Sequence, residues 1–271
     1  MKIFKNKQIL QSEILEDIDI SFVPTMGGLH QGHLSLIKKA KNYKCKILVT
    51  IFINPKQFNK VSDFKNYPSN VSDEIKKLKK LKVDYLYLPS YKEVYGFKTV
   101  NKIFLNKFSS KLCGKHRKGH FEGVLNVINR FLEIIKPKYI YLGQKDFQQL
   151  ILIKKHILKK KISSKIVECK TIREKNGVAC STRNINLNKK QLKIASNVYY
   201  YLYKLKKKMK KNYRFFKINS IKNDLFALGV NKIDYIENIN IKKLKKDNKF
   251  NNNSKLFIAY YIKKIRLIDN I

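Results

Sequence analysis

Hydrophobic positions in the first half of the chain form short runs, and each run is closed by a proline or a glycine. Four of these runs are rich in β-branched and aromatic residues and predict buried strands: IDISFVPT (18–25), KILVTIFINP (46–55), VDYLYLPS (83–90) and PKYIYLGQ (137–144). Before the last strand the spacing changes. Apolar residues there recur every three or four positions, which predicts a helix at 121–135 whose apolar face consists of Phe121, Val124, Leu125, Ile128, Phe131, Leu132 and Ile135. Strands that alternate with helices predict a parallel α/β sheet built of βαβ units.

The pattern changes after about residue 171. A long basic helix is predicted at 188–211, strands at 234–241 and 255–262, and a polar turn or loop at 245–255. These elements predict a smaller α+β domain at 172–271, preceded by the α/β domain at 1–171. In parallel α/β sheets ligands bind beyond the carboxyl ends of the strands. We therefore expect the functional residues in the loops that follow the strands of the first domain.

The formal net charge of +41 favours a polyanionic partner, such as nucleic acid or an anionic membrane. The positive charge is almost entirely lysine, spread from Lys2 to Lys264, and it accompanies abundant asparagine, isoleucine, tyrosine and phenylalanine without tryptophan. Codons for these residues are rich in A and T, so a coding bias in the genome explains the charge at least as well. Charge alone therefore assigns no partner.

Other features argue against several classes of protein. No apolar run approaches the roughly 20 residues that cross a bilayer, and acids such as Glu13 and Asp19 occur where a signal peptide would be apolar. We therefore expect a cytoplasmic protein. The cysteines form no C-x-x-C pair, which argues against a zinc cage or a disulfide framework.

The stretch PTMGGLHQGHLSLI (24–37) lies where a predicted strand ends and a predicted helix begins. We expect its proline to end the strand, and Gly27 and Gly28 to let the backbone approach a ligand. The first turn of the helix would point free N–H groups at that ligand, and His30 and His33 can lie on the same side of it. Phosphate is the ligand that suits such donors.

Six blocks of the sequence resemble, in order, the signature motifs of pantothenate synthetases. They are PTMGGLHQGHLSLI (24–37), TIFINPKQF (50–58), RKGHFEGV (117–124), YLGQKDFQQL (141–150), TIREKNGVACSTRN (171–184) and RLIDN (266–270). This family belongs to the H-x-G-H nucleotidyltransferase superfamily. The resemblance implies a Rossmann-like parallel-sheet nucleotidyltransferase domain that binds ATP and pantoate, followed by a smaller α+β C-terminal domain that acts as a lid.

The implied activity is an ATP-dependent ligase that condenses pantoate with beta-alanine to form pantothenate. The pantoate carboxylate attacks the α-phosphorus of ATP, pyrophosphate leaves, and the amine of beta-alanine then opens the pantoyl adenylate and releases AMP. A carboxylate is already ionised at neutral pH, so the first step needs alignment and charge stabilisation rather than a general base. The implied partners are ATP with Mg²⁺, pantoate, beta-alanine and a second subunit in a homodimer, with no membrane and no specific nucleic acid. The sequence has no cluster of carboxylates that would bind Mg²⁺, so we expect mainly the phosphates of ATP to hold this ion.

Matching the motifs position by position implies three groups of site residues. His33 corresponds to the family's proton-donating histidine, and His30, Lys145 and Arg183 are expected to act with it in catalysis. Gln57 and Gln149 are expected to bind pantoate, and Gln57 also beta-alanine. The residues expected to bind ATP are Met26, Gly27, Gly28, Leu29, His30, Gln31, Gly32, His33, Gly143, Gln144, Lys145, Asp146, Ile172, Cys180, Ser181, Thr182 and Arg183.

Four further residues in family motifs are carried as site candidates: Asn54, Tyr67, Arg117 and His120. The chain also departs from the family, which usually has Glu at Gln144, Arg at Ser69, Pro at Lys118, Leu at Cys180 and Ser at Thr182. Arginine and serine are not interchangeable, so a role of residues 66–69 in closing the site stays open.

Two other functions stay open at this point: a nucleotidyltransferase that adenylylates a different acid, and a basic nucleic-acid-binding protein with a decayed site. Several residues also have structural interpretations. His116 and His156 match no motif and are expected to be solvated or capping. Ser181 can cap a helix. The tyrosines at 199–201 are expected to pack in the core rather than to stack on bases.

Overall fold

The computed structural model describes residues 1–14, 19–212 and 216–271. These residues divide into two compact units, Met1–Lys170 and Thr171–Ile271, the first with a six-stranded sheet and the second with a four-stranded one. The boundary predicted from the sequence, between residues 171 and 172, lies one residue later than this one. Ile18, at the start of the first predicted strand, lies outside the described residues.

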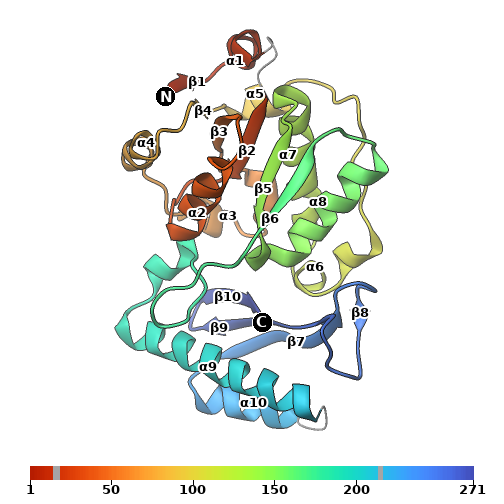
Figure 1. Ribbon diagram of the computed structural model, residues 1–271. Helices are drawn as coiled ribbons and strands as arrows, with labels where there is room; N and C mark the ends of the chain where they lie inside the picture. Colours follow the sequence, from red (N-terminus) through yellow and green to blue (C-terminus); the bar gives the residue numbers. More distant parts are fainter. Residues whose placement is uncertain (15–18, 213–215) are drawn as a thin grey trace. The chain divides into compact units, whose positions relative to one another are not determined.

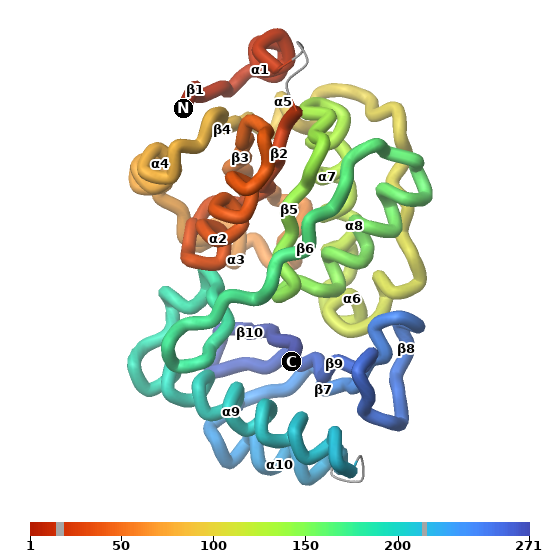
Figure 2. Tube along the Cα trace, viewed as in Figure 1, coloured from red at the N-terminus to blue at the C-terminus, as the bar shows by residue number. Residues whose placement is uncertain are grey.

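The six strands of the N-terminal unit all run parallel, in the order β1-β4-β3-β2-β5-β6 (Figure 1). They are β1 (Lys2–Phe4), β2 (Ile20–Thr25), β3 (Lys46–Ile51), β4 (Tyr85–Tyr87), β5 (Tyr139–Gly143) and β6 (Lys165–Cys169). From β2 the chain builds β3 and β4 on one side, and it then returns to add β5 and β6 on the other (Figure 2). The Rossmann-like parallel sheet is confirmed, and the runs at 18–25, 46–55, 83–90 and 137–144 contain its four central strands.

Helices cover both faces of this sheet, because strands this apolar cannot be left open to water. They are α1 (Lys7–Ile14), α2 (Gln31–Ala40), α3 (Val61–Lys65), α4 (Val71–Lys80), α5 (Tyr91–Tyr95), α6 (Cys113–His116), α7 (His120–Ile135) and α8 (Phe147–Lys159), with short 3-10 turns η1 (Pro55–Gln57), η2 (Lys107–Ser110) and η3 (Gln144–Asp146). On one face Val23 of β2 packs in a buried cluster with Ile37 of α2 and Leu78 of α4.

Helix α7 covers the opposite face. All seven apolar residues predicted on one side of 121–135 are buried, which confirms that prediction. The Phe131 ring meets Phe22 of β2 edge to face, with ring centroids 5.9 Å apart, and Tyr87 of β4 at 6.3 Å. Val127 and Ile134 are buried too, so the apolar face of the helix is wider than the spacing indicates.

The prediction that Pro24 ends β2 is wrong. Pro24 lies inside the strand, in register with Thr50 of β3. On the other side, β5 pairs with β2 only at Ser21 and Phe22. Pro24 therefore lies where β2 has one paired neighbour, and a residue without an N–H is tolerated at such a position.

The C-terminal unit combines an antiparallel sheet, in the order β10-β9-β7-β8, with two helices. Its elements are η4 (Thr182–Asn186), α9 (Lys189–Lys211), α10 (Ile218–Ala227), β7 (Lys232–Asn240), β8 (Lys245–Lys246), β9 (Ser254–Ile262) and β10 (Ile265–Asn270). The smaller α+β domain and its long basic helix are confirmed, although the short strand β8 lies in the predicted loop. Among the described residues, no helix has the length and apolar character needed to span a bilayer.

A partly buried ion pair joins the two ends of the C-terminal unit. The Arg173 guanidinium donates two hydrogen bonds to the Asp269 carboxylate, at 2.7 and 2.9 Å, so the motifs at 171–184 and 266–270 meet. The Tyr199 ring covers this guanidinium at 4.3 Å. Tyr199 and Tyr201 pack against the core as predicted, whereas Tyr200 is exposed, so the prediction is wrong for Tyr200.

His156 of α8 is fully buried, so the expectation that it is solvated or capping is wrong. Its Nδ1 accepts a hydrogen bond from the Phe104 N–H at 3.2 Å, so Nε2 carries the proton and donates to Asn129 Oδ1 at 2.9 Å. The ring thus ties residue 104 to α7 and α8. Burial, assisted by the charge of Lys160, lowers the pKa of His156 to about 4.

We predict that the free energy of unfolding falls as the pH drops from 7 to 5.5. The unfolded chain binds a proton at His156 near pH 6.5 whereas the folded chain does so near pH 4, which corresponds to a loss of about 1 kcal/mol at this site. Denaturant unfolding at the two pH values should show a weaker pH dependence in H156Q than in the wild type. In the matched control H116Q, which changes an exposed ring, the dependence should persist. Equal pH dependence in H156Q and the wild type would contradict the prediction.

Candidate active site

Three of the sequence motifs begin at the carboxyl ends of β2, β3 and β5, which are neighbours in the sheet. Because parallel strands end at the same edge, the segments 26–33, 52–58 and 144–150 start side by side. The strand order reverses between β2 and β5, and α/β sheets form their ligand crevice at such a point. The predicted site residues of the N-terminal unit are thus brought to one edge of the sheet.

The turn after β2 is tightly constrained. Thr25 Oγ1 donates to the Thr50 carbonyl at 2.7 Å and accepts from the Gly27 N–H at 3.2 Å. Gly27 and Gly28 have φ angles of +80° and +61°, which other residues adopt only with strain. A Cβ at Gly27 would also lie 2.7 Å from Oγ of Ser69. Ser69 therefore contacts this turn, although the family arginine is missing.

The next two residues of the turn bind helix α4. The Gly28 N–H donates to the Glu74 carboxylate, and Nζ of Lys77 donates to the Leu29 carbonyl at 3.2 Å. The N–H groups of Gly27 and Gly28 are therefore occupied by protein acceptors. The glycines can still let the backbone approach a ligand, but their N–H groups do not bind phosphate, because protein acceptors already occupy both.

The two histidines of the motif cap the start of α2 and each other. His30 Nδ1 accepts from the Gly32 N–H at 3.1 Å, and His33 Nδ1 accepts from the His30 N–H at 3.4 Å. The ring centroids lie 4.1 Å apart. Since both Nδ1 atoms are acceptors, both neutral rings carry their proton on Nε2. The pair therefore offers two ring N–H donors, as the sequence predicts.

Lys145, after β5, provides the positive charge beside these rings. Burial lowers the pKa of His30 to about 4, and the charge of Lys145 contributes. The pKa of His33 falls to about 3, because of burial first and then the neighbouring His30 and Lys145. Lys145 is itself largely buried, with Nζ 3.7 Å from Oδ1 of Asp146, so it is not a mere surface charge. At neutral pH the histidines therefore supply N–H dipoles, and Lys145 supplies the charge.

Gln57 sits in a second cluster, built by the motifs that follow β3 and begin α7. Its backbone carbonyl accepts from Arg117 at 3.1 Å and from His120 Nδ1 at 2.8 Å, and Arg117 also donates to His120 Nε2 at 3.0 Å. A Cβ at Gly123 would lie 2.1 Å from the Lys56 carbonyl, so only glycine allows α7 to approach η1 this closely. The Gln57 side-chain amide makes no hydrogen bond with another described residue.

The two adjacent glutamines of α8 have separate surroundings. Gln148 is buried and structural, because its amide binds the Phe108 and Lys111 carbonyls, both at 2.7 Å. Gln149 is partly exposed, and its amide makes no hydrogen bond with another residue that the structure describes. The amide of Gln149, like that of Gln57, is therefore available to a ligand.

The remaining candidates of the N-terminal unit make structural contacts. Asn54 is buried and binds the Gly123 carbonyl at 3.2 Å and the Tyr95 hydroxyl at 2.9 Å. The Tyr67 ring packs on Phe58, with centroids 5.5 Å apart. Gln144, where the family has Glu, donates to Glu168 at 3.5 Å.

Five predicted ATP-binding residues belong to the C-terminal unit: Ile172, Cys180, Ser181, Thr182 and Arg183. The Cys180 N–H donates to the Ile172 carbonyl at 2.9 Å, which fixes the two ends of this segment together. Ser181 Oγ accepts from the Arg183 N–H at 3.3 Å and caps η4, as its structural interpretation predicts. Their part in ATP binding stays a prediction.

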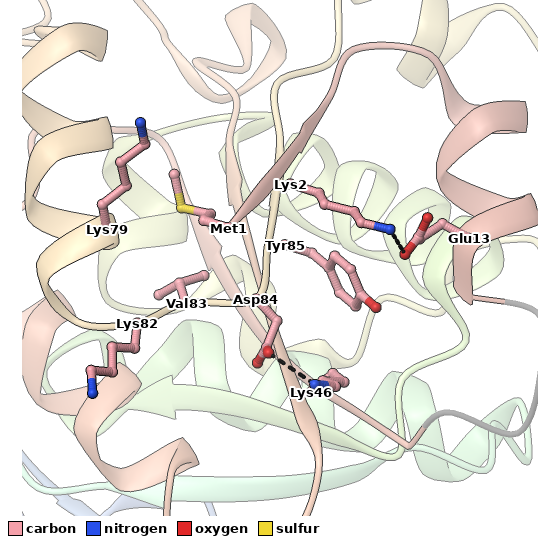
Figure 3. A pocket seen from close by; sticks show the side chains of 9 residues that line it. All are labelled: Met1, Lys2, Glu13, Lys46, Lys79, Lys82, Val83, Asp84 and Tyr85. Carbon is pink, nitrogen blue, oxygen red and sulfur yellow. Dashed lines mark hydrogen bonds and ion pairs between the residues drawn. The ribbon is translucent and has the colours of Figure 1, made fainter.

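A surface hollow lies at the opposite edge of the N-terminal sheet, where β1, β3 and β4 begin (Figure 3). Two of its lysines form ion pairs, Lys2 with Glu13 at 2.6 Å and Lys46 with Asp84 at 3.3 Å. The motif residues lie at the other edge, so this hollow is separate from the candidate site. In the described part of the chain, no group of three His, Cys, Asp or Glu side chains is placed to hold a metal ion.

The family model for pantoate-beta-alanine ligase matches residues 2–271. The chain belongs to the pantoate-beta-alanine ligase family. It is 37% identical over 267 residues to the pantothenate synthetase of Francisella tularensis subsp. novicida, an alignment that covers 98% of this chain and 94% of that protein. Family membership makes the chain a ligase of pantothenate biosynthesis.

Solved structures agree with this assignment. The crystal structure of pantoate-beta-alanine ligase from Francisella tularensis, complexed with beta-gamma ATP and beta-alanine, has a TM-score of 0.84 and 37% identity, covering 100% of this chain and 97% of that one. Pantothenate synthetase from Thermus thermophilus has a TM-score of 0.91 at 26% identity, covering 100% and 99%. The two-domain architecture implied by the motifs is that of this family.

We predict that His30 and His33 stay neutral, with the proton on Nε2, from pH 8 down to about pH 5 in the absence of ligand. Both pKa values lie at about 4 or below, so neither ring should gain a proton in this range. Long-range ¹H–¹⁵N spectra of the ring nitrogens measure tautomer and titration together, and the variants H30Q and H33Q assign the signals. A ring that becomes protonated between pH 7 and 6 would contradict the geometry described above.

Proposed function

We propose that this chain condenses pantoate with beta-alanine to form pantothenate, using ATP and passing through an enzyme-bound pantoyl adenylate. The observation that carries this proposal is the group of His30, His33 and Lys145 beside the turn that follows β2. A relative that is 37% identical was crystallised with beta-gamma ATP and beta-alanine, which supports the same substrates here.

In the first step an oxygen of the pantoate carboxylate attacks the α-phosphorus of ATP. The bond from that phosphorus to the bridging oxygen breaks, and pyrophosphate leaves with the electron pair. Lys145 neutralises the phosphates, while the Nε2–H groups of His30 and His33 donate hydrogen bonds to them. Negative charge next to an imidazole favours its protonated form, so His33 becomes able to donate a proton once nucleotide is bound.

In the second step the unprotonated amine of beta-alanine attacks the carbonyl carbon of the adenylate. The bond from that carbon to the phosphate oxygen breaks, AMP leaves with the electron pair, and the nitrogen releases a proton to solvent. Gln57 and Gln149 hold pantoate through their uncommitted amides, which can both donate to and accept from its oxygens without repelling a carboxylate. Gln57 is also assigned to beta-alanine. The two glutamines thus orient the acid for both steps.

Mg²⁺ enters with ATP and is held mainly by its phosphates, since hard cations of this kind bind phosphate oxygens readily. The remaining ATP contacts are assigned to residues 26–33 and 143–146 of the N-terminal unit and to Ile172 and 180–183 of the C-terminal unit, which acts as a lid. We also assign the chain, by its family, to a homodimer in the cytoplasm.

We predict that replacing His33 with alanine slows pantoate-dependent pyrophosphate release by about 100-fold, because one donor to the developing charge is lost. The assay contains ATP, Mg²⁺ and pantoate, and beta-alanine is then added to follow AMP and pantothenate together. H116A, which changes an exposed histidine, is the matched control.

Two outcomes favour the other functions. A nucleotidyltransferase for a different acid gives no pantoate-dependent pyrophosphate. A nucleic-acid-binding protein binds RNA or DNA in a steeply salt-dependent way and is indifferent to the His33 substitution.

We predict that replacing Arg117 with alanine raises the KM for pantoate by about tenfold and changes the KM for ATP by less than about twofold. Arg117 donates to the Gln57 carbonyl and to Nε2 of His120, and His120 Nδ1 donates to the same carbonyl. Loss of Arg117 therefore removes one donor and the contact that holds the other in place, which lets Gln57 shift. K118A removes the same charge from the neighbouring residue, whose side chain is exposed, and should behave like the wild type. An unchanged KM for pantoate in R117A would refute the role given to this cluster.

A further inference from the structure

Glu74 of α4 is a buried carboxylate that the reaction above does not use. Only 2% of the residue is exposed. Its Oε1 accepts hydrogen bonds from the Gly28 N–H and from Ser69 Oγ, the latter at 3.4 Å. Its Oε2 has no hydrogen-bond partner among the described residues. Removing a carboxylate from water costs free energy, and the hydrogen bonds to Oε1 offset that cost only in part, because Oε2 is buried without a partner in the described ranges.

Helix α4 packs closely against the turn that Glu74 contacts. A Cβ at Gly27 would lie 3.1 Å from each oxygen of the Glu74 carboxylate, so α4 packs directly on the glycine pair. Two successive residues with positive φ turn the Gly28 N–H away from the strand ladder. A buried N–H needs an acceptor, and Glu74 provides it from a helix that is 46 residues away in the sequence.

Lys77 makes the complementary contact. It lies three residues after Glu74, on the same side of α4, and its Nζ donates to the Leu29 carbonyl at 3.2 Å. The Glu74 carboxylate thus binds the N–H of Gly28, and the Lys77 ammonium binds the carbonyl of the next residue, Leu29. His30 follows immediately, and the charge of Lys77 also reaches its ring and helps to lower its pKa.

We propose that Glu74 and Lys77 are positioning residues of the ATP site, which fix the Gly28–Leu29 backbone so that His30 and His33 present their Nε2–H groups to the phosphates. This inference rests on the proposed function. It gives α4 a role in ATP binding, although none of the six sequence motifs includes a residue of this helix. Neither side chain needs to touch the nucleotide, because each acts through the backbone that carries the histidines.

The test compares α4 variants whose altered side chain contacts the turn with α4 variants whose altered side chain does not. K77M keeps the aliphatic stem and removes the donor to Leu29, and E74A removes the acceptor of the Gly28 N–H. The matched controls are K76M and D73N, because Lys76 and Asp73 lie on the exposed side of the same helix and pair with each other across 3.8 Å. E74Q keeps an acceptor oxygen and serves as the conservative rescue.

The affinity for Mg²⁺-ATP, measured by calorimetric titration of the full chain without pantoate, is the primary readout. We expect the Kd to rise about fivefold in K77M and about tenfold in E74A, and E74Q, K76M and D73N to stay within about twofold to threefold of the wild type. The KM for beta-alanine should stay within about twofold in every variant, a split that a general loss of folding would not produce. If E74A does not fold, K77M against its control K76M decides the question.

An unchanged Kd for ATP in both K77M and E74A would overturn the proposal, as would equal weakening of ATP and beta-alanine. Failure of the proposed function is distinguishable from this result. If the wild type binds ATP but releases no pyrophosphate with pantoate, the reaction is wrong, while the titrations of the α4 variants still support or refute the positioning role. If the wild type binds no ATP, both are refuted.

Discussion

The turn between β2 and α2 depends on hydrogen bonds to the side chains of neighbouring elements. Two consecutive glycines in the left-handed region direct backbone groups away from both the sheet and the helix, and each buried group then requires its own partner. Thr25 supplies one acceptor, α4 supplies an acceptor and a donor, and the two imidazoles satisfy the start of α2. These bonds fix the backbone from which the two imidazoles extend.

This arrangement assigns two tasks, the orientation of hydrogen-bond donors and the supply of positive charge, to different residues. Buried imidazoles with low pKa values stay neutral, so they provide direction, while the neighbouring ammonium provides charge. A protonated histidine pair 4.1 Å apart would repel itself and Lys145 in the absence of nucleotide. Neutral rings avoid this repulsion in the free protein, and in the proposed reaction the phosphates of ATP supply the negative charge that favours a protonated ring.

Much of the fold was predictable from the sequence because its signals are local. Apolar runs that end in turn residues indicate the strands, and the motifs follow these strands in the sequence. The 3-and-4 spacing at 121–135 indicates helix α7, which packs on the sheet. Partners that are distant in sequence carry no such signal. Glu74 and Lys77 lie in SDEIKKLKK, which reads as a solvated helix face, and His156 lies between lysines in KKHILKK. Pro24 was misassigned for the same reason, because whether a strand is paired on one side or on both is decided by segments elsewhere in the chain.

The contact between Gly123 and the Lys56 carbonyl has a consequence for how members of the family can differ. It closes a loop of chain that contains α3 to α6 and β4, and both ends of that loop lie beside Gln57, whose carbonyl binds Arg117 and His120. The entropy of closing a loop grows only slowly with its length. We therefore expect insertions and deletions in the outer parts of this loop to leave Gln57 in place, provided that Gly123 is kept at the contact with Lys56 and that α4 keeps its position.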